Sequence, residues 1–556
     1  MDPITFDTPV YVSNSSTTAA EPSIRVDKSD PNKRIWISAP TGIGARTGIV
    51  NAGGDLFWHS DNNGQTWTVH QLTTLVGGGD SDATTGTGSQ VYVTGLTLAN
   101  VTLAASCDNG ATFTTNPIPT AGTIEDRQWL DMYEDAPKPS PTAPDFLLNI
   151  GLAKFLGPQP ENPAVVLYQI TSPSPACTPP QAGPPINTAL PTCPIQGPIH
   201  PDCYQWPGNL AIDEATGDAY VTYNTEGDNT LGIGNTNTDK VVVARVDGAG
   251  AGPVTQLDAN IFTAATNRPD TFDSFTALAV DADSNVYVVW TERHPATGET
   301  ASMYAYSTDK GVTWSAPIQV NQGPKTTAFP WPVAGAAGKL DIVYYGTDAT
   351  GLSPETVAET SQWKVYMAQS LNAAGANPTF TEVAATGVMH QGSVCTSGTG
   401  CGAGTRDLLD FFMIDIDEQC LANIAYTDNF NTPPPTGDHQ EWVTFVQQNG
   451  GPGLCSPTAV MLRSLDARIK GRGIELRWRT AAEPSLLGFN VFRSDHASRE
   501  AKVNRTLIRA RGSVRGASYR LVDRRARPGV TYLYRLQAVT TDGRRSWDRS
   551  IRVTPR

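Results

Sequence analysis

The stretch STDKGVTW, residues 307–314, decides the fold, because its pattern of Ser, Asp, Gly and aromatic residue recurs twice more in the chain. The other copies are SDNNGQTW at 60–67, where Asn replaces Asp, and SCDNGATF at 106–113. The pattern suits a tight turn, since a carboxylate can accept turn N–H bonds, Gly adopts positive φ and the aromatic ring packs between sheets. The residues given this structural role are Ser60, Asn62, Gly64, Trp67, Ser106, Asp108, Gly110, Phe113, Ser307, Asp309, Gly311 and Trp314.

The composition favours an all-β protein. The 556 residues include 51 Gly and 42 Pro, and 39% are apolar. Long Leu/Ala/Glu/Lys runs are missing, so we expect many short strands joined by turns. A chain of this length exceeds one ordinary core unless that core is built from repeats.

Four segments repeat one strand-turn-strand pattern with an Asp at the turn. They are SIRVDKSDPNKRIWISA, NLAIDEATGDAYVTYNT, ALAVDADSNVYVVWTE and FMIDIDEQCLANIAYTD, whose matched residues are Asp27, Asp213, Asp281 and Asp417. The separations of 186, 68 and 136 residues fit three, one and two units of about 62 to 68 residues. Three weaker copies fall in the gaps. The sequence therefore predicts a seven-bladed β-propeller over residues 1–455, with six blades as the alternative.

The two ends of this region should meet in one blade. FDTPVYVSNSSTTAAEPSI near the N-terminus matches WSAPIQVNQGPKTTAFPWPV, where an outer strand runs into the inner strand of the next unit. We therefore expect residues 4–13 to pair beside EWVTFVQQ and to close the last blade.

The last region, 456–556, differs in pattern and in charge. Its alternating strands, an early Trp and the segment TYLYRLQAV resemble a fibronectin type III-like β-sandwich. It has 23 Lys+Arg and 8 Asp+Glu, about +15, which leaves 17 and 46, about −29, for residues 1–455. We interpret these as two domains, and the basic one either docks on the acidic body or holds an anionic cell-surface polymer.

Eight cysteines indicate an oxidising compartment. They allow 105 pairings, and only local bridges can be suggested. Cys395 and Cys401 flank a Gly-rich loop, whereas Cys177, Cys193 and Cys203 lie in or beside a Pro-rich insertion. The start MDPITFDTPV has neither a basic nor an apolar targeting segment, and no run is long enough to span a bilayer. We expect an extracellular or cell-surface protein whose signal lies outside this chain.

The three turn motifs resemble the Asp-box, or bacterial neuraminidase (BNR) repeat, of sialidases and related propellers. The resemblance implies that the boxes are scaffold at the turn between the third and fourth strands, away from the active centre. Function is then expected at the opposite face, where the loops enter each innermost strand.

Acids, arginines and tryptophans recur at these entries. A carbohydrate site uses such groups, because Trp faces beside carboxylates suit sugar rings. The alternative is that the acids accept backbone N–H bonds near the channel. The candidates for catalysis are Asp80, Asp82, Asp126, Arg127, Arg406 and Asp410, and those for substrate binding are Glu21, Trp129, Trp206, Asp273 and Trp331.

A sialidase would require three arginines for the sugar carboxylate, a Tyr nucleophile assisted by a Glu, and an Asp acid/base. The nearest candidates are Arg127, Arg293 and Arg406, with Glu292 and Tyr345 as the Glu/Tyr pair. The early Arg-Ile-Pro motif of that family is absent, since EPSIRVD puts Arg25 in mid-strand, and seven units depart from the family's six blades. The charge of the body also opposes an anionic substrate.

Three functions stay open from the sequence. The first is a secreted sialidase-like propeller that binds, and in one version hydrolyses, carbohydrate or a glycoconjugate. The second is a non-catalytic propeller that binds a protein or a cell surface, and the third is a polysaccharide lyase or other metal-assisted enzyme, for which the candidate histidines are His200, His294, His390 and His439.

Other partners are less well supported. The acidic body and the lack of interleaved aromatics in the basic domain argue against nucleic acid. No cofactor is required and no metal ligand set can be named, although Asp-rich loops such as DADSN leave structural calcium open. We expect a monomer.

Overall fold

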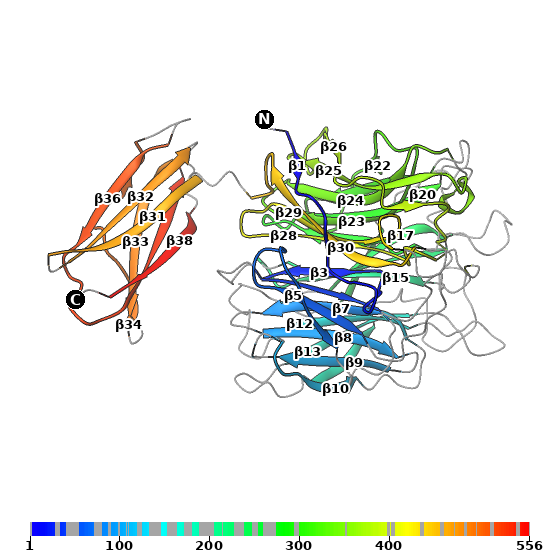
Figure 1. Ribbon diagram of the computed structural model, residues 1–556, viewed down its shortest axis with the longest axis horizontal. Helices are drawn as coiled ribbons and strands as arrows, with labels where there is room; N and C mark the ends of the chain where they lie inside the picture. The colour runs from blue at the N-terminus through cyan, green and yellow to red at the C-terminus, as the bar shows by residue number, and fades with distance from the viewer. Residues whose placement is uncertain are drawn as a thin grey trace. The chain divides into compact units, whose positions relative to one another are not determined.

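The computed structural model describes most of the 556 residues. The parts that it does not describe are 1–2, 28–33, 41–54, 72–79, 87–89, 98–99, 107, 109, 119–124, 133–145, 153–163, 172–180, 188–204, 214, 227–237, 247–253, 259–273, 294–299, 351–352, 397–400, 402–405, 434–438, 456–460, 472, 483–485, 496–497, 512–515, 541–544 and 555–556. The described chain is all-β, with one short 3-10 turn at Pro354–Thr356. It forms two compact units, Met1–Leu454 and Cys455–Arg556 (Figure 1). No helix in the described chain could span a membrane.

The larger unit is built from antiparallel sheets that each follow chain order. The first four sheets are β3 (Ser23–Val26), β4 (Ile35–Ala39), β5 (Leu56–Ser60) and β6 (Thr68–Gln71); β7 (Ser81–Gly86), β8 (Gln90–Thr97), β9 (Asn100–Ser106) and β10 (Thr114–Ile118); β11 (Glu125–Met132), β12 (Phe146–Leu152), β13 (Ala164–Thr171) and β14 (Gln181–Asn187); and β15 (Gln205–Ile212), β16 (Ala219–Glu226), β17 (Thr238–Val246) and β18 (Val254–Asp258).

The next sheet has nine strands. It comprises β19 (Ala277–Val280), β20 (Val286–Arg293), β21 (Thr300–Ser307), β22 (Ile318–Gln319), β23 (Thr326–Ala334), β24 (Leu340–Thr347), β25 (Gln362–Ser370), β26 (Thr381–Ala384) and β27 (His390–Gln391). Only one parallel pairing, Thr300 opposite Thr326, joins β21 to β23. Apart from this pairing, β19–β22 and β23–β26 each follow the same order of antiparallel neighbours as the earlier sheets.

The last sheet of the larger unit combines both ends of that unit. Strands β28 (Met413–Ile416), β29 (Ala422–Asp428) and β30 (Trp442–Gly450) are joined by β1 (Thr5–Phe6) and β2 (Val10–Tyr11). Thr5 lies opposite Gly450, and Val10 lies opposite Phe445. The N-terminal segment thus pairs with the segment that the sequence predicted.

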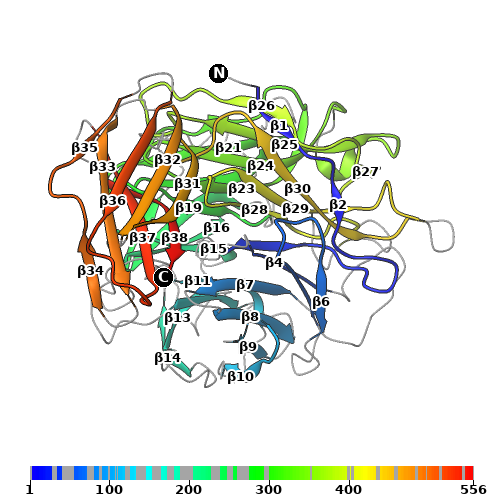
Figure 2. The ribbon, with the colours of Figure 1, turned by 60° about the vertical axis from the view of Figure 1, so that its left-hand side comes forward.

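The first strands of successive sheets contact one another. β3 contacts β7, and the contacts continue through β11, β15, β19, β23 and β28, which in turn contacts β3. Figure 2 shows β7, β11, β15, β19, β23 and β28 in the middle of the larger unit, with β10, β14, β26 and β27 at its periphery. The predicted hairpins at Asp27, Asp213, Asp281 and Asp417 each follow a first strand.

The smaller unit has two sheets. One contains β31 (Met461–Lys470), β32 (Gly473–Ala482) and β36 (Ser518–Asp523), and the other contains β33 (Leu486–Asp495), β34 (Ser498–Lys502), β35 (Ile508–Arg509), β37 (Tyr532–Thr540) and β38 (Arg545–Val553). Trp478 of one sheet packs against Phe489 of the other, with ring centres 5.4 Å apart. The alternating apolar residues therefore form a core between the sheets.

The three Asp-box motifs form turns between the third and fourth strands of their sheets. In 307–314 the Ser307 hydroxyl donates to Asp309 and accepts the N–H of Gly311 (2.7 Å each), while Asp309 accepts the N–H of Thr313 at 2.8 Å. The other two copies make the same bonds. At Gly110, φ is +78° and an added Cβ would lie 2.3 Å from the Trp36 ring, so this position requires glycine.

A fourth, degenerate turn of this kind was not predicted. Between β25 and β26 the Ser370 hydroxyl donates to Asn372, which accepts the N–H of Thr379 at 3.0 Å. The insertion of three residues between these partners hides the motif in the sequence.

Candidate functional site

Polar side chains on the first strands tie neighbouring sheets together. Asp82 accepts the N–H of Leu130, Asp131 accepts that of Ile212, and Asp415 accepts that of Val26, each at 2.8 Å. Asn209 does the same for Leu278 at 2.7 Å. These residues are therefore part of the scaffold, since a buried backbone N–H needs an acceptor.

Asp82 belongs to this scaffold rather than to an open site. One carboxylate oxygen accepts the N–H of Ala83 at 2.9 Å and a hydroxyl bond from Ser23, and the other accepts Leu130. The side chain is fully buried. With three donors in place, its carboxylate has little capacity left for a substrate.

A separate group of charges lies at the end of the sheets where the first strands begin. It combines carboxylates that precede the first strands β3 and β7 and the third strand β5 with an arginine on β11 and an ion pair in the loop before β28. We call it the axial charge cluster, and its members are Glu21, Asp55, Asp80, Arg127, Arg406 and Asp410.

Arg127 is the centre of this cluster. Its Nη1 lies 3.7 Å from Glu21 Oε1, and both side chains are buried. Its guanidinium carbon lies 3.9 Å from the centre of the Phe411 ring and 4.8 Å from that of Trp129. The charge is therefore held against aromatic faces, where a guanidinium is favoured over other cations.

Four aromatic rings lie together beneath Arg127. Trp129 packs against Phe275 with ring centres 5.1 Å apart, and Trp331 packs against Phe411 at 5.2 Å. Trp129 also contacts Trp331 and Phe411 at 6.4 Å. These rings come from β11, from the segment before β19, from β23 and from the segment before β28, so they join three sheets.

The accessible edge of the cluster consists of Asp80, Arg406 and Asp410. Arg406 is ion-paired with Asp410, and their side chains are 11% and 14% exposed, whereas Glu21 and Arg127 are 1% and 0% exposed. Asp80 is 9% exposed. A ligand that approaches this face would meet these three side chains first.

The carboxyl groups compete for the two positive charges. Burial raises the pKa of Glu21 well above its usual value, Asp80 and Asp410 raise it further, and Arg127 and Arg406 oppose the rise. Burial likewise raises the pKa of Asp55, with a contribution from Asp80. Burial raises the pKa of Asp410, and Arg406 opposes that rise. The cluster therefore favours a proton on the most buried acids while Arg406 remains charged.

Several buried polar atoms of the cluster and of the neighbouring Gln128 and Trp129 have no hydrogen-bond partner among the described residues, as is also true of atoms elsewhere in the chain. A buried polar atom without a partner is rare and marks a place where a ligand or water can bind. These atoms are Glu21 Oε1, Asp55 Oδ1, Arg127 Nε and Nη1, Gln128 Oε1, Trp129 Nε1 and Arg406 Nε.

The backbone around the cluster adopts strained conformations. Glu21 has φ of 61° and Leu409, which precedes Asp410, has φ of 55°. Strand β11 has a bulge between Glu125 and Gln128, which includes Arg127. Non-glycine residues at positive φ and bulges are concentrated at functional sites, because both re-aim side chains at a cost in stability.

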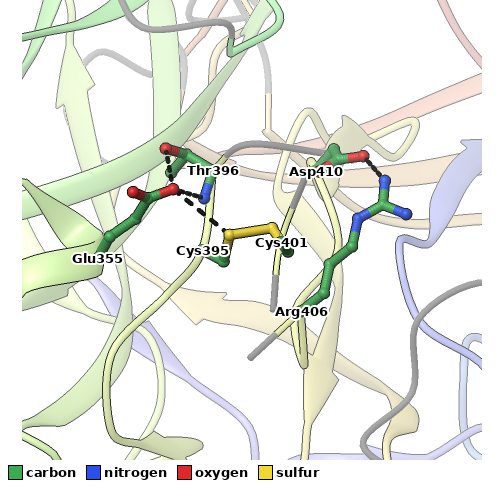
Figure 3. The surroundings of a disulfide bond; sticks show 6 residues. All are labelled: Glu355, Cys395, Thr396, Cys401, Arg406 and Asp410. Atoms are coloured by element: carbon green, nitrogen blue, oxygen red, sulfur yellow. Dashed lines mark hydrogen bonds and ion pairs between the residues drawn. A yellow bond between two sulfur atoms is a disulfide. The ribbon is translucent and has the colours of Figure 1, made fainter. Parts of the chain in front are cut away.

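A disulfide precedes the ion pair in the sequence. Cys395 and Cys401 are bonded as the sequence suggested, and Figure 3 shows this bond together with Arg406 and Asp410. Glu355 accepts the N–H of Thr396 at 2.9 Å, which ties the loop to the 3-10 turn. Cys420 and Cys455 are also disulfide-bonded, whereas Cys107, Cys177, Cys193 and Cys203 lie outside the described residues.

The structure brings Arg127, Trp129, Trp331 and Asp410 together with Glu21, Asp80 and Arg406, all of which were candidates. The side chains of Asp126, in β11, and Trp206, in β15, lie outside the described residues, as does all of Asp273. Asp55, Gln128, Phe275 and Phe411 were not proposed from the sequence. Phe275 and Phe411 lie within the segments FDSF and RDLLDFF, which were selected for their charged residues. No local pattern marks Asp55.

Glu292 and Tyr345, the proposed Glu/Tyr pair, each have contacts of their own in the described residues. Glu292 accepts a bond from the Trp290 indole at 2.9 Å. The Tyr345 hydroxyl accepts the N–H of Thr427 at 3.1 Å, and its ring stacks on Phe412 at 4.0 Å. Arg293 ends β20 opposite Thr300.

His390 is a buried structural residue. Its Nδ1 lies 2.9 Å from the Asn429 amide oxygen and 3.8 Å from Asp407, and its Nε2 lies 3.2 Å from the Ser393 carbonyl. His439 contacts the Thr432 carbonyl, and His200 and His294 lie outside the described residues. His390 and His439 therefore offer no support for a lyase.

A cavity of about 810 Å³ lies at the other end of the inner strands. Its lining includes Arg25, Asp131, Asp415 and the turn residue Asp281, together with Trp331. Asp131 and Asp415 are occupied by the bonds between first strands, and Arg25 donates to the Ile24 and Leu130 carbonyls. Asp213, Asp417 and Glu418 also line this cavity, and none of the six residues of the axial charge cluster does.

Metal ligation finds no support in the described part of the chain, which has no group of three or more His, Cys, Asp or Glu side chains arranged to hold an ion. In the DADSN loop, Asp281 accepts bonds from the N–H groups of Asp283, Asn285 and Gly338 and from the Tyr287 hydroxyl. These donors serve the hairpin turn.

No family model and no curated protein matches this chain. Solved structures do show similarity. A protein of unknown function from Dyadobacter fermentans aligns with 80% of this chain and 99% of its own at 12% identity and a TM-score of 0.41. An α-L-arabinanase from Penicillium chrysogenum, complexed with arabinobiose, aligns with 79% and 98% at 12% identity and 0.39. A sialidase mutant from Streptococcus pneumoniae aligns with 80% and 70% at 12% identity and 0.37.

Proposed function

We propose that the larger unit is a seven-bladed β-propeller closed by the N-terminal strand. Seven first strands that contact one another in sequence, from β3 through β28 and back to β3, support this architecture. The smaller unit is proposed to be a fibronectin type III-like β-sandwich that begins at about residue 456.

The propeller is proposed to bind and hydrolyse carbohydrate at the axial charge cluster. The observation that carries this proposal is the position of Arg127, which stacks on Phe411 and Trp129 and lies beside Glu21, with two of its donors unused by the described residues. Aromatic rings next to carboxylates provide both the apolar face and the hydrogen-bond groups that a sugar ring needs.

Asp80 and Asp410 are the proposed catalytic acids, because they lie at the accessible edge. Glycosidases commonly use two carboxyl groups, one as proton donor and one as base or nucleophile, and assign these roles by giving the two groups different environments. Asp410 is ion-paired with Arg406. The charge of Asp80 raises the pKa of both Glu21 and Asp55. Glu21 and Asp55 lie deeper in the cluster than Asp80 and Asp410. Their charges limit the negative charge that these two edge acids can carry.

Sialic acid is a weaker choice of substrate than a neutral sugar. The cluster contains two arginines, Arg127 and Arg406, of the three that a sialidase-like clamp requires. The disulfides support an extracellular protein, since such bonds persist in oxidising compartments.

The test is hydrolysis of a panel of polysaccharides and aryl glycosides, including a fluorogenic sialoside, by the full chain. Asp410→Asn and Asp80→Asn should each lower kcat by about 10²- to 10⁴-fold. Asp309→Asn makes the same charge change in an Asp-box and should leave kcat unchanged. Glycan binding without turnover by the unaltered protein would favour a non-catalytic propeller. Equal turnover by all variants would place catalysis elsewhere.

A further inference from the structure

One sheet of the smaller unit exposes a flat, strongly basic surface. Residues opposite each other on neighbouring strands share a face, and so do alternate residues along one strand. Arg468 lies opposite Glu475, and Arg477 lies opposite Arg520. Ile474, Leu476 and Trp478 occupy the buried face of the same strand. We call the opposite surface the cationic face, and its basic residues are Arg468, Lys470, Arg477, Arg479 and Arg520.

A single buried carboxylate organises this face. Glu475 is 0% exposed and accepts bonds from Arg468 at 2.7 Å, Lys470 at 2.9 Å and Arg477 at 3.0 Å, while Arg520 Nε lies 3.6 Å away. The four cations are between 47% and 59% exposed. One carboxylate thus holds four cationic side chains in place, so less side-chain entropy is lost when a ligand binds.

The face keeps a net positive charge. Five basic residues outnumber Glu475 and Asp466, which lies opposite Arg477. Neighbouring strands are roughly 4.8 Å apart and alternate residues along a strand roughly 6.8 Å apart, so the charges form a two-dimensional array. Of the 23 basic residues in 456–556, 21 are Arg, whose planar fork binds carboxylate and sulfate with two parallel hydrogen bonds.

We propose that the cationic face binds an extended acidic polysaccharide that carries carboxylate or sulfate groups. A linear polyanion can lie across a flat array, whereas a small anion would use one fork. The face as described has no aromatic residue on which a nucleobase could stack. The disulfides indicate an oxidising compartment, where acidic polysaccharides are abundant. This site is separate from the axial charge cluster and would bring the propeller to its substrate or surface.

The test compares two triple variants of the full chain. Arg477→Gln, Arg479→Gln and Arg520→Gln together remove three charges from the face. Lys502→Gln, Arg505→Gln and Arg509→Gln remove three exposed charges from the other sheet. Binding to heparin (sulfated), polygalacturonate (carboxylated) and neutral dextran is measured at several salt concentrations, and the thermal melt of each variant verifies folding.

The face variant should bind heparin, polygalacturonate or both at least about tenfold more weakly, and the slope of log K against log salt should fall by up to about three. The control variant should bind as the unaltered chain does, so a loss confined to the face variant assigns the binding to the smaller unit and not to the proposed active site. Equal losses in the two triple variants would overturn the proposal. Tighter binding of a 20-base-pair DNA duplex than of both polyanions would also overturn it in favour of nucleic acid.

Discussion

The guanidinium of Arg127 stacks 3.9 Å from the ring centre of Phe411, although one residue belongs to strand β11 and the other to the segment that leads into β28. The contact places a positive charge against an aromatic floor and next to Glu21. The predictions below concern Glu21 beside Arg127, the disulfide before the ion pair, the first turn motif and the carboxylate of the cationic face.

Replacing Glu21 by Gln should make the protein less sensitive to high pH. The folded-state pKa of Glu21 is raised by burial, so the folded form holds the proton and its stability falls as the pH rises from about 4.5 through the folded pKa. Gln resembles the protonated acid and does not ionise. The Tm of Glu21→Gln relative to the unaltered protein should therefore be higher at pH 8 than at pH 5. Glu418→Gln removes the same charge from an exposed position, and its Tm difference should not change in this way.

Breaking the Cys395–Cys401 disulfide should lower the affinity for a glycan more than it lowers the free energy of unfolding. The closed loop is short, so its loss should cost about 2 kcal/mol of stability. Arg406 and Asp410 follow this loop in the sequence, and we expect their positions at the accessible edge to depend on it. The affinity of Cys395→Ser/Cys401→Ser for a bound glycan should fall, as measured by calorimetry. Unchanged affinity would show that Glu355 and Thr396 hold the loop without the bond.

Replacing Asn62 by Asp should stabilise the first Asp-box. Asn62 donates to the Thr66 hydroxyl, whereas in the other copies the Thr hydroxyl donates to the Asp. Hydrogen bonds from the Thr112 hydroxyl and backbone lower the pKa of Asp108 in its box. Asn62→Asp should therefore raise the Tm at neutral pH. Because the pKa is lowered on folding, the gain should disappear as the pH falls below about 4. A lower Tm at pH 7 would contradict this.

Replacing Glu475 by Gln should destabilise the smaller unit at neutral pH. Hydrogen bonds from Lys470 and Arg468 lower the pKa of Glu475 to about 2. Its contribution is thus present above about 4.5 and is lost as the pH falls toward 2. The variant should melt below the unaltered protein at pH 7, and the two should converge near pH 2. A constant difference across this range would mean that packing, not charge, explains the loss.

Local patterns in the sequence predicted much of the fold. The Asp-box turns and the Asp-centred hairpins are short-range features, since their hydrogen bonds join residues a few positions apart. The pairing of the N-terminal segment with β30 was also predicted, because the outer strand of a repeat leaves a recognisable copy at the chain end. The sequence pattern could not show that Asp82 is scaffold whereas Asp80 lies at the accessible edge, because both belong to one short segment with the same composition.

By itself, the sequence determined the all-β class, the turn motifs, the two regions of opposite charge and the stretch EDRQW as a site of interest, because periodicity and turn chemistry are local. The tertiary structure was needed to show which acids hold neighbouring sheets together and which belong to the axial charge cluster. It engaged Asp82 with Leu130 of the next sheet, buried Glu21 beside Arg127 and added Asp55 to the cluster. The physical reason is that burial and long-range charge set the chemistry of a carboxyl group, and both arise from segments far apart in the chain.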